Sequence, residues 1–385
     1  MNKVLKEILK YVAIFAVLFV VLFCTDKLLR KKYMTSELEG AMVEEYYDNI
    51  GNNEVVFVGD CEVYENFSPI TMWEKYGITS YIRGSAQQLV WQSYYLLKET
   101  FEYEVPKVAV FNVLSLKYNT PQKEGYNRMT LDGMKMSAIK LEAIEASMTE
   151  DEELISYIIP FIKFHKRWSE LSEEDFIYWF KNDKVTVNGY LMRADVKPVD
   201  YLADYYEENG KVSLTYDELV KICRGTPNRY DSSKDFGENA MKYLDMMTEL
   251  CKENGVELVL LKSPSIEPYW YPEWDKCIED YATANDLLYI NMLDSLNEME
   301  IDFLTDTYDQ GLHLNVYGAE KAADWLGKKL TENFTLTDYR NNEEVSKNWK
   351  EKSDFYYDMK ADQEAEFAEK GYLEKFKKTD ITGKN

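Results

Sequence analysis

The sequence contains five short apolar runs of about the length of a β-strand, separated by stretches with helical spacing. These runs cover residues 55–58, 78–82, 108–114, 256–261 and 287–290. Helical spacing is clearest over residues 87–101 and 237–254, where Gly255 follows as a C-terminal cap. Strands that alternate with helices form a mainly parallel sheet with helices on both faces. We therefore expect a three-layer α/β sandwich with a five-stranded sheet, whose chemistry lies at the carboxyl ends of the strands.

Two parts of the chain depart from this alternation. Residues 117–234 are rich in Met, Trp and acidic residues, and they contain helical pieces at 135–148 and 152–168. We expect them to form a helical insertion between the third and fourth strands of an α/β domain that covers residues 36–335. Residues 336–385 are highly charged. That composition predicts a helical tail, which is either a solvated helix packed loosely on the domain or a frayed end.

The N-terminal segment is strongly apolar, with an uninterrupted apolar run at residues 11–24. No small-x-small cleavage site follows the run, and bulky residues precede Cys24, where a lipoprotein signal needs a small one. We expect an uncleaved transmembrane signal anchor at residues 8–28, after a cytoplasmic segment of residues 1–7. A cleaved signal peptide is the alternative. A long hydrophilic domain behind a lone anchor usually translocates, so we expect the main domain outside the cell membrane.

Charge and cysteine usage exclude several classes of function. The net charge of −24 disfavours binding to nucleic acid, because phosphates repel an acidic surface. Five cysteines at irregular spacing match neither a paired metal motif nor a dense disulfide framework. The sequence also lacks a Gly-rich phosphate loop and a dinucleotide fingerprint. We therefore expect no metal and no cofactor. One disulfide bond among the last three cysteines is left as an alternative.

The chain has only two histidines, and His313 is the better candidate for a general base. It lies in a Gly-containing loop ahead of a helical stretch at residues 316–330, with Asp309 four residues upstream. A carboxylate at this spacing can fix the tautomer of an imidazole base. Asp306 is the alternative orienting group. His165 lies among aromatic residues of the insertion, and we expect it to be structural.

Cys61 is the nucleophile that we expect to pair with His313. It follows the first strand in a Gly-Asp-Cys turn, where a helix N-terminus would ease ionisation of the thiol. An inert thiol at a strand end is the alternative. We expect the developing oxyanion to be held by the backbone N–H groups of Cys61 and Gly84, because glycine lets the backbone approach a ligand. Ser85 and the side-chain amide of Asn112 complete the predicted oxyanion and substrate-binding set.

These motifs resemble those of the SGNH (GDSL-like) hydrolase superfamily, which implies a flavodoxin-like α/β fold. More closely, they resemble membrane-anchored SGNH-like proteins that accompany membrane-bound O-acyltransferases in envelope polysaccharide modification, such as the D-alanyl transfer protein and the alginate O-acetylation proteins. The resemblance is good over residues 54–84 and 255–327 and looser over 107–116. The matching positions are Gly59, Asp60 and Cys61 for the first block, Gly84 for the second, and Asp309 and His313 for the last.

Three departures separate the chain from that family. Cysteine replaces the usual nucleophilic serine, the aspartate stands four rather than three residues before the histidine, and the Gly-x-Asn-Asp block is not recognisable.

The resemblance implies a membrane-tethered acyl esterase or O-acyltransferase that acts on acylated envelope glycan through Cys61, His313 and Asp309, with a thioester intermediate. Its alternative is a catalytically silent accessory protein that docks on a membrane-bound O-acyltransferase.

Overall fold

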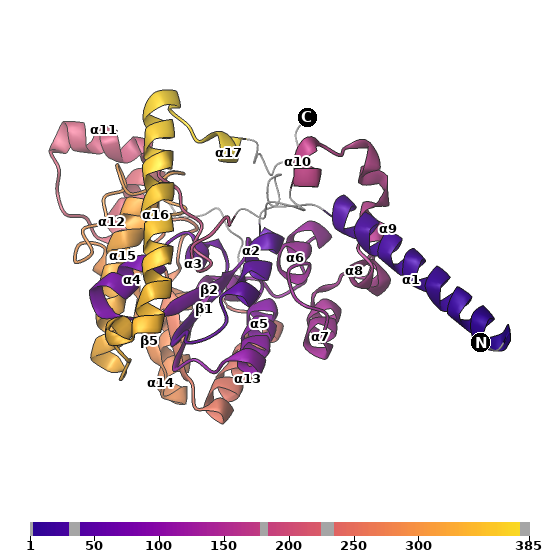
Figure 1. Cartoon of the computed structure of the whole chain (residues 1–385). Helices are drawn as coiled ribbons and strands as arrows, with labels where there is room; N and C mark the ends of the chain where they lie inside the picture. Colours follow the sequence, from indigo (N-terminus) through magenta and orange to yellow (C-terminus); the bar gives the residue numbers. More distant parts are fainter. Residues whose placement is uncertain (1–2, 31–38, 178–183, 225–234, 378–385) are drawn as a thin grey trace.

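The computed structural model describes residues 3–30, 39–177, 184–224 and 235–377. Five strands form one sheet in the order β2-β1-β3-β4-β5, and every neighbouring pair is parallel (Figure 1). This confirms the predicted five-stranded parallel sheet. The strands are β1 (Val55–Gly59), β2 (Ser80–Gly84), β3 (Val108–Asn112), β4 (Glu257–Lys262) and β5 (Leu288–Asn291).

Helices cover both faces of the sheet, as the alternation of strands and helices predicts. One face packs against α5 (Val90–Tyr103), α13 (Glu238–Asn254) and α14 (Pro272–Asn285). The other packs against α4 (Pro69–Tyr76) and α15 (Val316–Asn333), with α16 (Glu343–Lys370) beside them. Successive strand residues point to opposite faces, so Val55 and Phe57 join one hydrophobic core while Val56 and Val58 join the other.

The strand order creates a topological switch point between β1 and β3. From β1 the chain crosses to β2 on one side, and it then returns to β3 on the other side. In open parallel sheets of this order, a crevice forms outside the carboxyl ends of the two strands at the switch point. The short helix α3 (Cys61–Tyr64) begins at the end of β1. Cys61 therefore lies at the position where such folds bind ligands.

The predicted insertion contributes to both hydrophobic cores rather than forming a core of its own. Leu131 and Ile144 belong to the core beneath α5, whereas Tyr190 and Leu191 belong to the core beneath α4. Its helices within the described residues are α6 (Glu124–Leu131), α7 (Ala138–Ser147), α8 (Leu154–Ile158), α9 (Phe161–Phe164), η3 (His165–Ser169), α10 (Glu173–Ile177), α11 (Asp200–Asn209) and α12 (Tyr216–Arg224).

The expectation of one helical piece over residues 152–168 is wrong. The structure divides this stretch into α8, α9 and η3, with Pro160 between the first two. Proline removes a backbone donor, and its ring clashes with the preceding turn, so a helix cannot run through it without a kink or break. The piece expected over residues 135–148 is present as the shorter α7.

The charged C-terminal segment is more firmly packed than the sequence predicts. In α16, Trp349 stacks on Trp73 of α4 with ring centroids 5.1 Å apart, and Tyr356 is fully buried. Residues 343–370 are therefore neither frayed nor loosely attached. Residues 378–385 lie outside the described residues.

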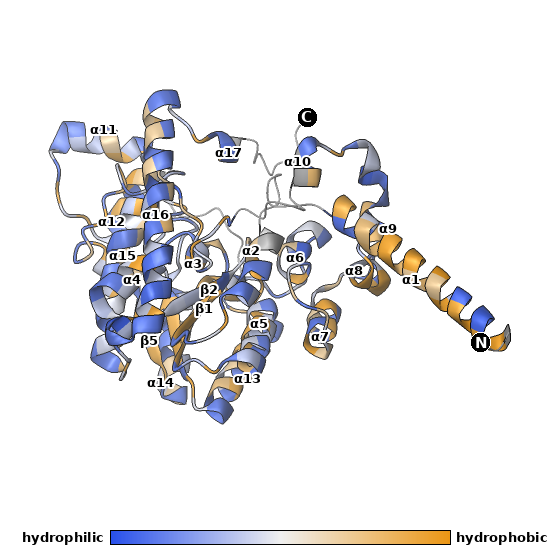
Figure 2. Ribbon diagram, viewed as in Figure 1, coloured by the Kyte–Doolittle hydropathy of each residue, from blue (hydrophilic) through white to orange (hydrophobic). Residues whose placement is uncertain are grey.

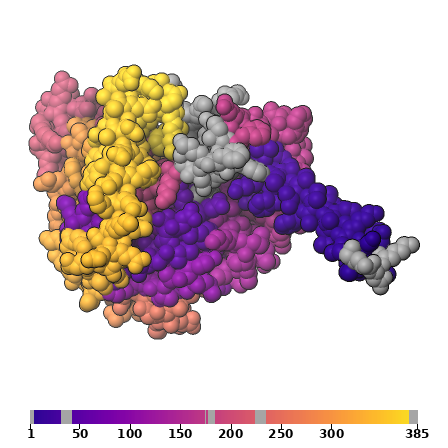
Figure 3. All heavy atoms as spheres, in the orientation of Figure 1, coloured from indigo at the N-terminus to yellow at the C-terminus, as the bar shows by residue number. Residues whose placement is uncertain are grey.

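The N-terminal helix α1 (Lys3–Leu29) is long and apolar enough to cross a membrane. Its 27 residues extend about 40 Å at 1.5 Å per residue, and a hydrocarbon core measures about 30 Å. The side chains of residues 4–23 are all exposed. Figure 3 shows this helix projecting from the body of the protein, and Figure 2 shows that most of its length consists of hydrophobic residues.

Candidate active site

The turn between β1 and α3 places Cys61 at the start of the helix. Gly59 has a φ of +149°, and a Cβ atom there would lie 2.9 Å from that of Asn112, so glycine is required. Asp60 caps α3 by accepting the backbone N–H of Glu62 at 3.2 Å. Cys61 is the first helical residue, so its own N–H has no acceptor inside α3. Both the thiol and this N–H group therefore belong to a residue at the carboxyl edge of the sheet.

The loop before α15 holds His313 by two contacts with Asp309. The Oδ2 atom of Asp309 lies 2.6 Å from Nδ1 of the ring, and Oδ1 accepts the backbone N–H of His313 at 2.8 Å. Gln310 and Gly311 have φ angles of +66° and +91°, which fold the loop tightly enough for this contact. The Nε2 atom of His313 has no hydrogen-bond partner within the described residues. It is therefore available to exchange a proton.

Asp306, the alternative orienting group, does not contact the His313 ring. Its Oδ2 atom accepts hydrogen bonds from Lys321 Nζ at 2.7 Å and from the backbone of Asp302 at 2.8 Å. His165 lies on the surface, where its Nδ1 contacts the carbonyl oxygen of Ile162 at 2.7 Å. The geometry thus favours Asp309 as the carboxylate partner of His313.

Cys61 and His313 line one cavity of about 690 Å³. The two residues come from opposite ends of the α/β domain, and the sheet brings them together as the strand pattern predicts. The wall of the cavity is mixed. Its large apolar and aromatic residues are Leu114, Tyr118, Tyr269, Trp274 and Leu312, and its carboxylates are Asp60, Glu62, Asp235 and Glu267.

The charges in this cavity couple the protonation of Cys61 and His313. Burial raises the pKa of the Cys61 thiol, and the positive charge of His313 opposes that rise. Burial alone lowers the pKa of His313. The negative charges of Cys61, Glu65 and Asp309 outweigh this effect and raise the pKa to well above its usual value. Because the ionised form of each residue stabilises that of the other, thiol and imidazole titrate as a pair.

Glu65 is a second carboxylate on the His313 ring, and the sequence reasoning missed it. It is buried at the C-terminal end of α3, with Oε2 3.2 Å from Nδ1 of His313. The hydroxyl group of Tyr308 donates a hydrogen bond to Glu65. The ring of Tyr308 stacks on that of His313 with centroids 5.9 Å apart. Burial raises the pKa of Glu65, against the opposing charge of His313. The spacing of four residues from Cys61 along a helix could have identified it.

Gly84 and Ser85 do not line the cavity. A Cβ atom on Gly84 would lie 2.9 Å from a side-chain methyl of Val63. The glycine thus lets α3 pack closely on β2. We had expected it to let a ligand approach the backbone instead. The Ser85 hydroxyl bonds to that of Thr130 at 2.5 Å. Neither residue is placed as the predicted oxyanion set requires.

Asn112 is also held away from the cavity, in a buried polar cluster beneath α3. Its Nδ2 donates to Asp60 at 2.9 Å and to Glu62 at 3.0 Å. Lys262 Nζ lies 3.0 Å from Glu62 Oε1, and both side chains are fully buried. Lys262 neutralises Glu62, while Asp60 accepts hydrogen bonds from Asn112 and from the backbone of Glu62, so the cluster fixes the start of α3. The side-chain amide of Asn112 is thereby already occupied.

Two other hydrogen-bond donors do line the cavity. Gln87 follows β2 with a φ of +51°, and Lys117 follows β3. Burial lowers the pKa of Lys117, but the charges of Tyr118, Asp60 and Glu62 raise it by more, so the ammonium stays protonated. Neither residue was predicted from the sequence, although each stands just beyond the carboxyl end of a strand.

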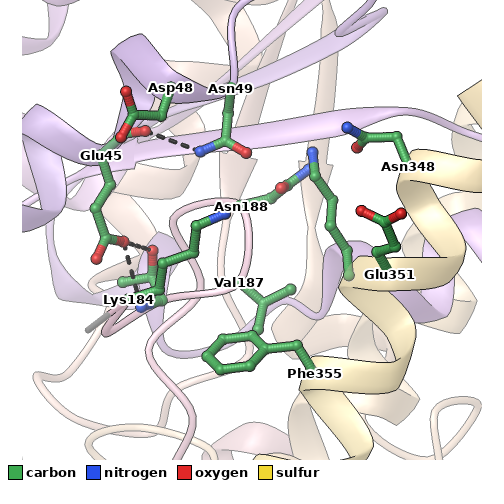
Figure 4. Close-up of a pocket in the computed structure, with 11 residues that line it drawn as sticks. Glu45, Asp48, Asn49, Lys184, Val187, Asn188, Asn348, Glu351 and Phe355 are labelled. Carbon is green, nitrogen blue, oxygen red and sulfur yellow. Dashed lines mark hydrogen bonds between the residues drawn. The ribbon is translucent and has the colours of Figure 1, made fainter. Parts of the chain in front are cut away.

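A second cavity, of about 440 Å³, lies between the end of α2 (Glu39–Glu45), residues 184–188 and α16 (Figure 4). Its lining includes Lys184, Asn188 and Lys352. Burial lowers the pKa of Lys352 to about 8. No cysteine or histidine is among the described residues that line it. The cavity with Cys61 and His313 is therefore the candidate active site.

A comparison with models of protein families found no matching family, and a search of curated proteins found no match. The resemblance to SGNH hydrolases therefore rests on the residues of this chain alone. Within the described ranges, no three His, Cys, Asp or Glu side chains are placed to hold a metal ion.

Proposed function

We propose that this protein is an extracytoplasmic, membrane-tethered acyl esterase or O-acyltransferase of the SGNH type, acting on acylated envelope glycan. One observation carries the proposal. Cys61 and His313 line the same cavity at the switch point of the sheet, and Asp309 holds the ring through Nδ1. This is the arrangement that covalent acyl transfer by a thiol needs.

In the proposed reaction, Cys61 is the nucleophile, His313 the base and Asp309 the group that orients the ring. Nε2 of His313 takes the proton of the Cys61 thiol, and the sulfur attacks the acyl carbonyl carbon of the ester. When the tetrahedral intermediate collapses, the ester C–O bond breaks and His313 returns the proton to the departing alkoxide oxygen. The product is a thioester on Cys61. Water or a glycan hydroxyl then attacks the thioester carbonyl carbon while His313 takes its proton. The C–S bond breaks, the acyl group leaves as a carboxylic acid or as a new glycan ester, and His313 returns the proton to the Cys61 sulfur.

The donors for the oxyanion come from the cavity wall. The backbone N–H of Cys61, the side-chain amide of Gln87 and the ammonium of Lys117 are available there. A charged donor in a buried site stabilises developing negative charge more strongly than a neutral one does. In this proposal, Gln87 and Lys117 bind the oxyanion, as was predicted for Gly84 and Asn112.

The shape and chemistry of the cavity support a glycan ester as substrate. The half-buried rings of Tyr118 and Tyr269 line the cavity and can contact a sugar, while Asn119 and Asp235 add polar groups at the same site. The helix α1 would tether the domain close to envelope polymers. A membrane-bound O-acyltransferase is the partner that the resemblance implies.

The direct test is hydrolysis of a short acyl ester by the full chain in detergent. We expect Cys61→Ala and His313→Ala each to reduce hydrolysis to the uncatalysed rate, and His165→Ala to leave it unchanged. If wild type and His313→Ala hydrolyse the ester equally slowly, the enzymatic proposal fails.

The second candidate is a catalytically silent accessory protein that docks on a membrane-bound O-acyltransferase. The engagement of Asn112 with Asp60 and Glu62 favours it, because that amide cannot serve an oxyanion. In cells, Cys61→Ala would then leave envelope acylation unchanged, while deletion of residues 3–29 would abolish it. Loss of acylation in Cys61→Ala rules this candidate out.

A further inference from the structure

A hydrophobic surface on the insertion, which the proposed reaction does not use, lies beside the C-terminal end of α1. Its side chains come from α8, α9, η3, α10 and the residue between α8 and α9, and we call it the insertion patch. The six residues and their exposed fractions are Ile155 (43%), Ile158 (37%), Ile159 (45%), Ile162 (38%), Trp168 (71%) and Phe176 (53%). Six large apolar side chains exposed within residues 155–176, on elements that contact α1 or one another, are unusual on a soluble surface and indicate a binding surface.

Specific contacts fix the insertion patch relative to α1. Asp26 of α1 accepts the backbone N–H of Phe161, the first residue of α9, at 2.7 Å. The guanidinium of Arg167 donates to the carbonyl oxygens of Leu29 and Arg30 at 3.3 and 3.1 Å. Arg167 is itself held by Asp175 in a buried ion pair of 2.7 Å. The patch and the end of α1 therefore form one unit.

The position of the patch along α1 coincides with the expected edge of the hydrocarbon core. A core of about 30 Å needs about 20 mostly apolar helical residues, and the exposed residues 4–23 have that length and are uncharged apart from Lys6, Glu7 and Lys10. The first charged residue after that run is Asp26, which is the residue that binds Phe161. In Figure 2, hydrophobic colour continues from α1 onto the neighbouring α9.

We propose that the insertion patch lies in the interfacial layer of the bilayer leaflet on the side of the α/β domain. This inference rests on α1 spanning the membrane, but it does not depend on the reaction at Cys61. An exposed indole such as that of Trp168 favours the interface, where its apolar ring meets acyl chains and its N–H meets headgroups. Lys166, which is exposed in the same segment, can reach lipid phosphates.

This arrangement gives the domain a second attachment to the membrane besides α1. A single helix leaves the domain free to rotate and tilt, whereas an additional interfacial surface fixes its height and orientation. The lipid bilayer is the occupant to which the geometry points, since the patch continues from the lipid-facing surface of α1. Coverage by another membrane protein is the competing outcome.

The test uses the full chain in phosphatidylcholine nanodiscs that carry brominated lipids, because bromine quenches tryptophan fluorescence at short range. Bromines are placed either near the ester bonds or near the chain ends. No tryptophan lies in α1, so the helix itself does not contribute. We expect stronger quenching by the shallow bromines, and Trp168→Phe should remove the larger part of it. Trp325→Phe, on α15, is the matched control and should change nothing.

A second variant keeps the reporter in place. Ile158→Ser combined with Ile162→Ser should weaken the quenching of Trp168 while α1 still anchors the chain. The proposal is overturned if Trp168→Phe and Trp325→Phe lose equal quenching, or if aqueous iodide quenches Trp168 in the nanodisc. Shielding of Trp168 from both bromine and iodide also overturns it, because protein then covers the patch.

Discussion

Asp309 and His313 are joined twice, through the ring at 2.6 Å and through the backbone N–H at 2.8 Å. In Asp309→Asn the amide can still fill the site, but it can present its NH₂ group to Nδ1 and so stabilise the wrong tautomer of the imidazole. We expect a fall in kcat of about 10⁴-fold with the fold intact, by analogy with the same change in the serine protease triad. Ester hydrolysis together with circular dichroism measures both.

Asp306→Asn is the matched control for that substitution. Asp306 is buried in the same loop but bonds to Lys321 and Asp302 instead of the ring. Its replacement should lower stability and leave the activity per folded molecule nearly unchanged. Equal losses of activity in the two variants would contradict the assignment of Asp309.

The pH dependence of the reaction should reflect the second carboxylate on His313. The charges of Cys61, Glu65 and Asp309 raise the pKa of the imidazole, and Glu65 opposes ionisation of the thiol. Glu65→Gln removes one negative charge, so both macroscopic pKa values of the Cys61–His313 pair should fall. The two limbs of the kcat/KM profile should then move to lower pH. A shift to higher pH, or none, would contradict this electrostatic role.

The cavity donors Gln87 and Lys117 should act on the transition state rather than on ground-state binding. Removing one oxyanion donor typically lowers kcat by about 10²–10³-fold. We expect Lys117→Met to show such a loss in kcat with little change in KM, and Gln87→Ala a smaller one. Kinetics with a short acyl ester separates the two parameters. A rise in KM alone would indicate that Lys117 only binds substrate.

The buried pair of Glu62 and Lys262 should support stability. Lys262→Met leaves the Glu62 carboxylate buried without its cation, which costs about 3–5 kcal/mol of unfolding free energy. The double variant Lys262→Met with Glu62→Gln should recover much of that loss. Lys276→Met, in an exposed pair, is the control and should not change the denaturant midpoint. A loss in the double variant as large as in Lys262→Met would contradict a charge-based explanation.

The sheet was predictable because its strands are buried on both faces and read as continuous apolar runs. Their ends were less certain. β2 runs to Gly84, beyond the apolar run, because Arg83 and Gly84 still pair with Val58 and Gly59. The charged Arg83 interrupts the apolar run, so the end of β2 could not be predicted from the pattern. Glu99 neutralises this charge only in the folded chain.

Cys61, His313 and Asp309 were predictable because each stands at a strand end or within a short local motif. The oxyanion set was not, since it depends on contacts across the sheet. Asn112 is occupied by Asp60 and Glu62, which no local spacing indicates. The catalytic roles of Cys61, His313 and Asp309 stay predictions.

The central claim is that Cys61 accepts an acyl group with His313 as base. It is tested most directly by intact mass and peptide mapping of the full chain after brief exposure to an activated acyl ester at neutral pH. We expect one acyl adduct on Cys61, sensitive to hydroxylamine as a thioester is, that is lost in Cys61→Ala and much slower to form in His313→Ala. Cys277→Ala, the control, should acylate like wild type. No adduct on Cys61, or one that forms equally fast without His313, would contradict the account.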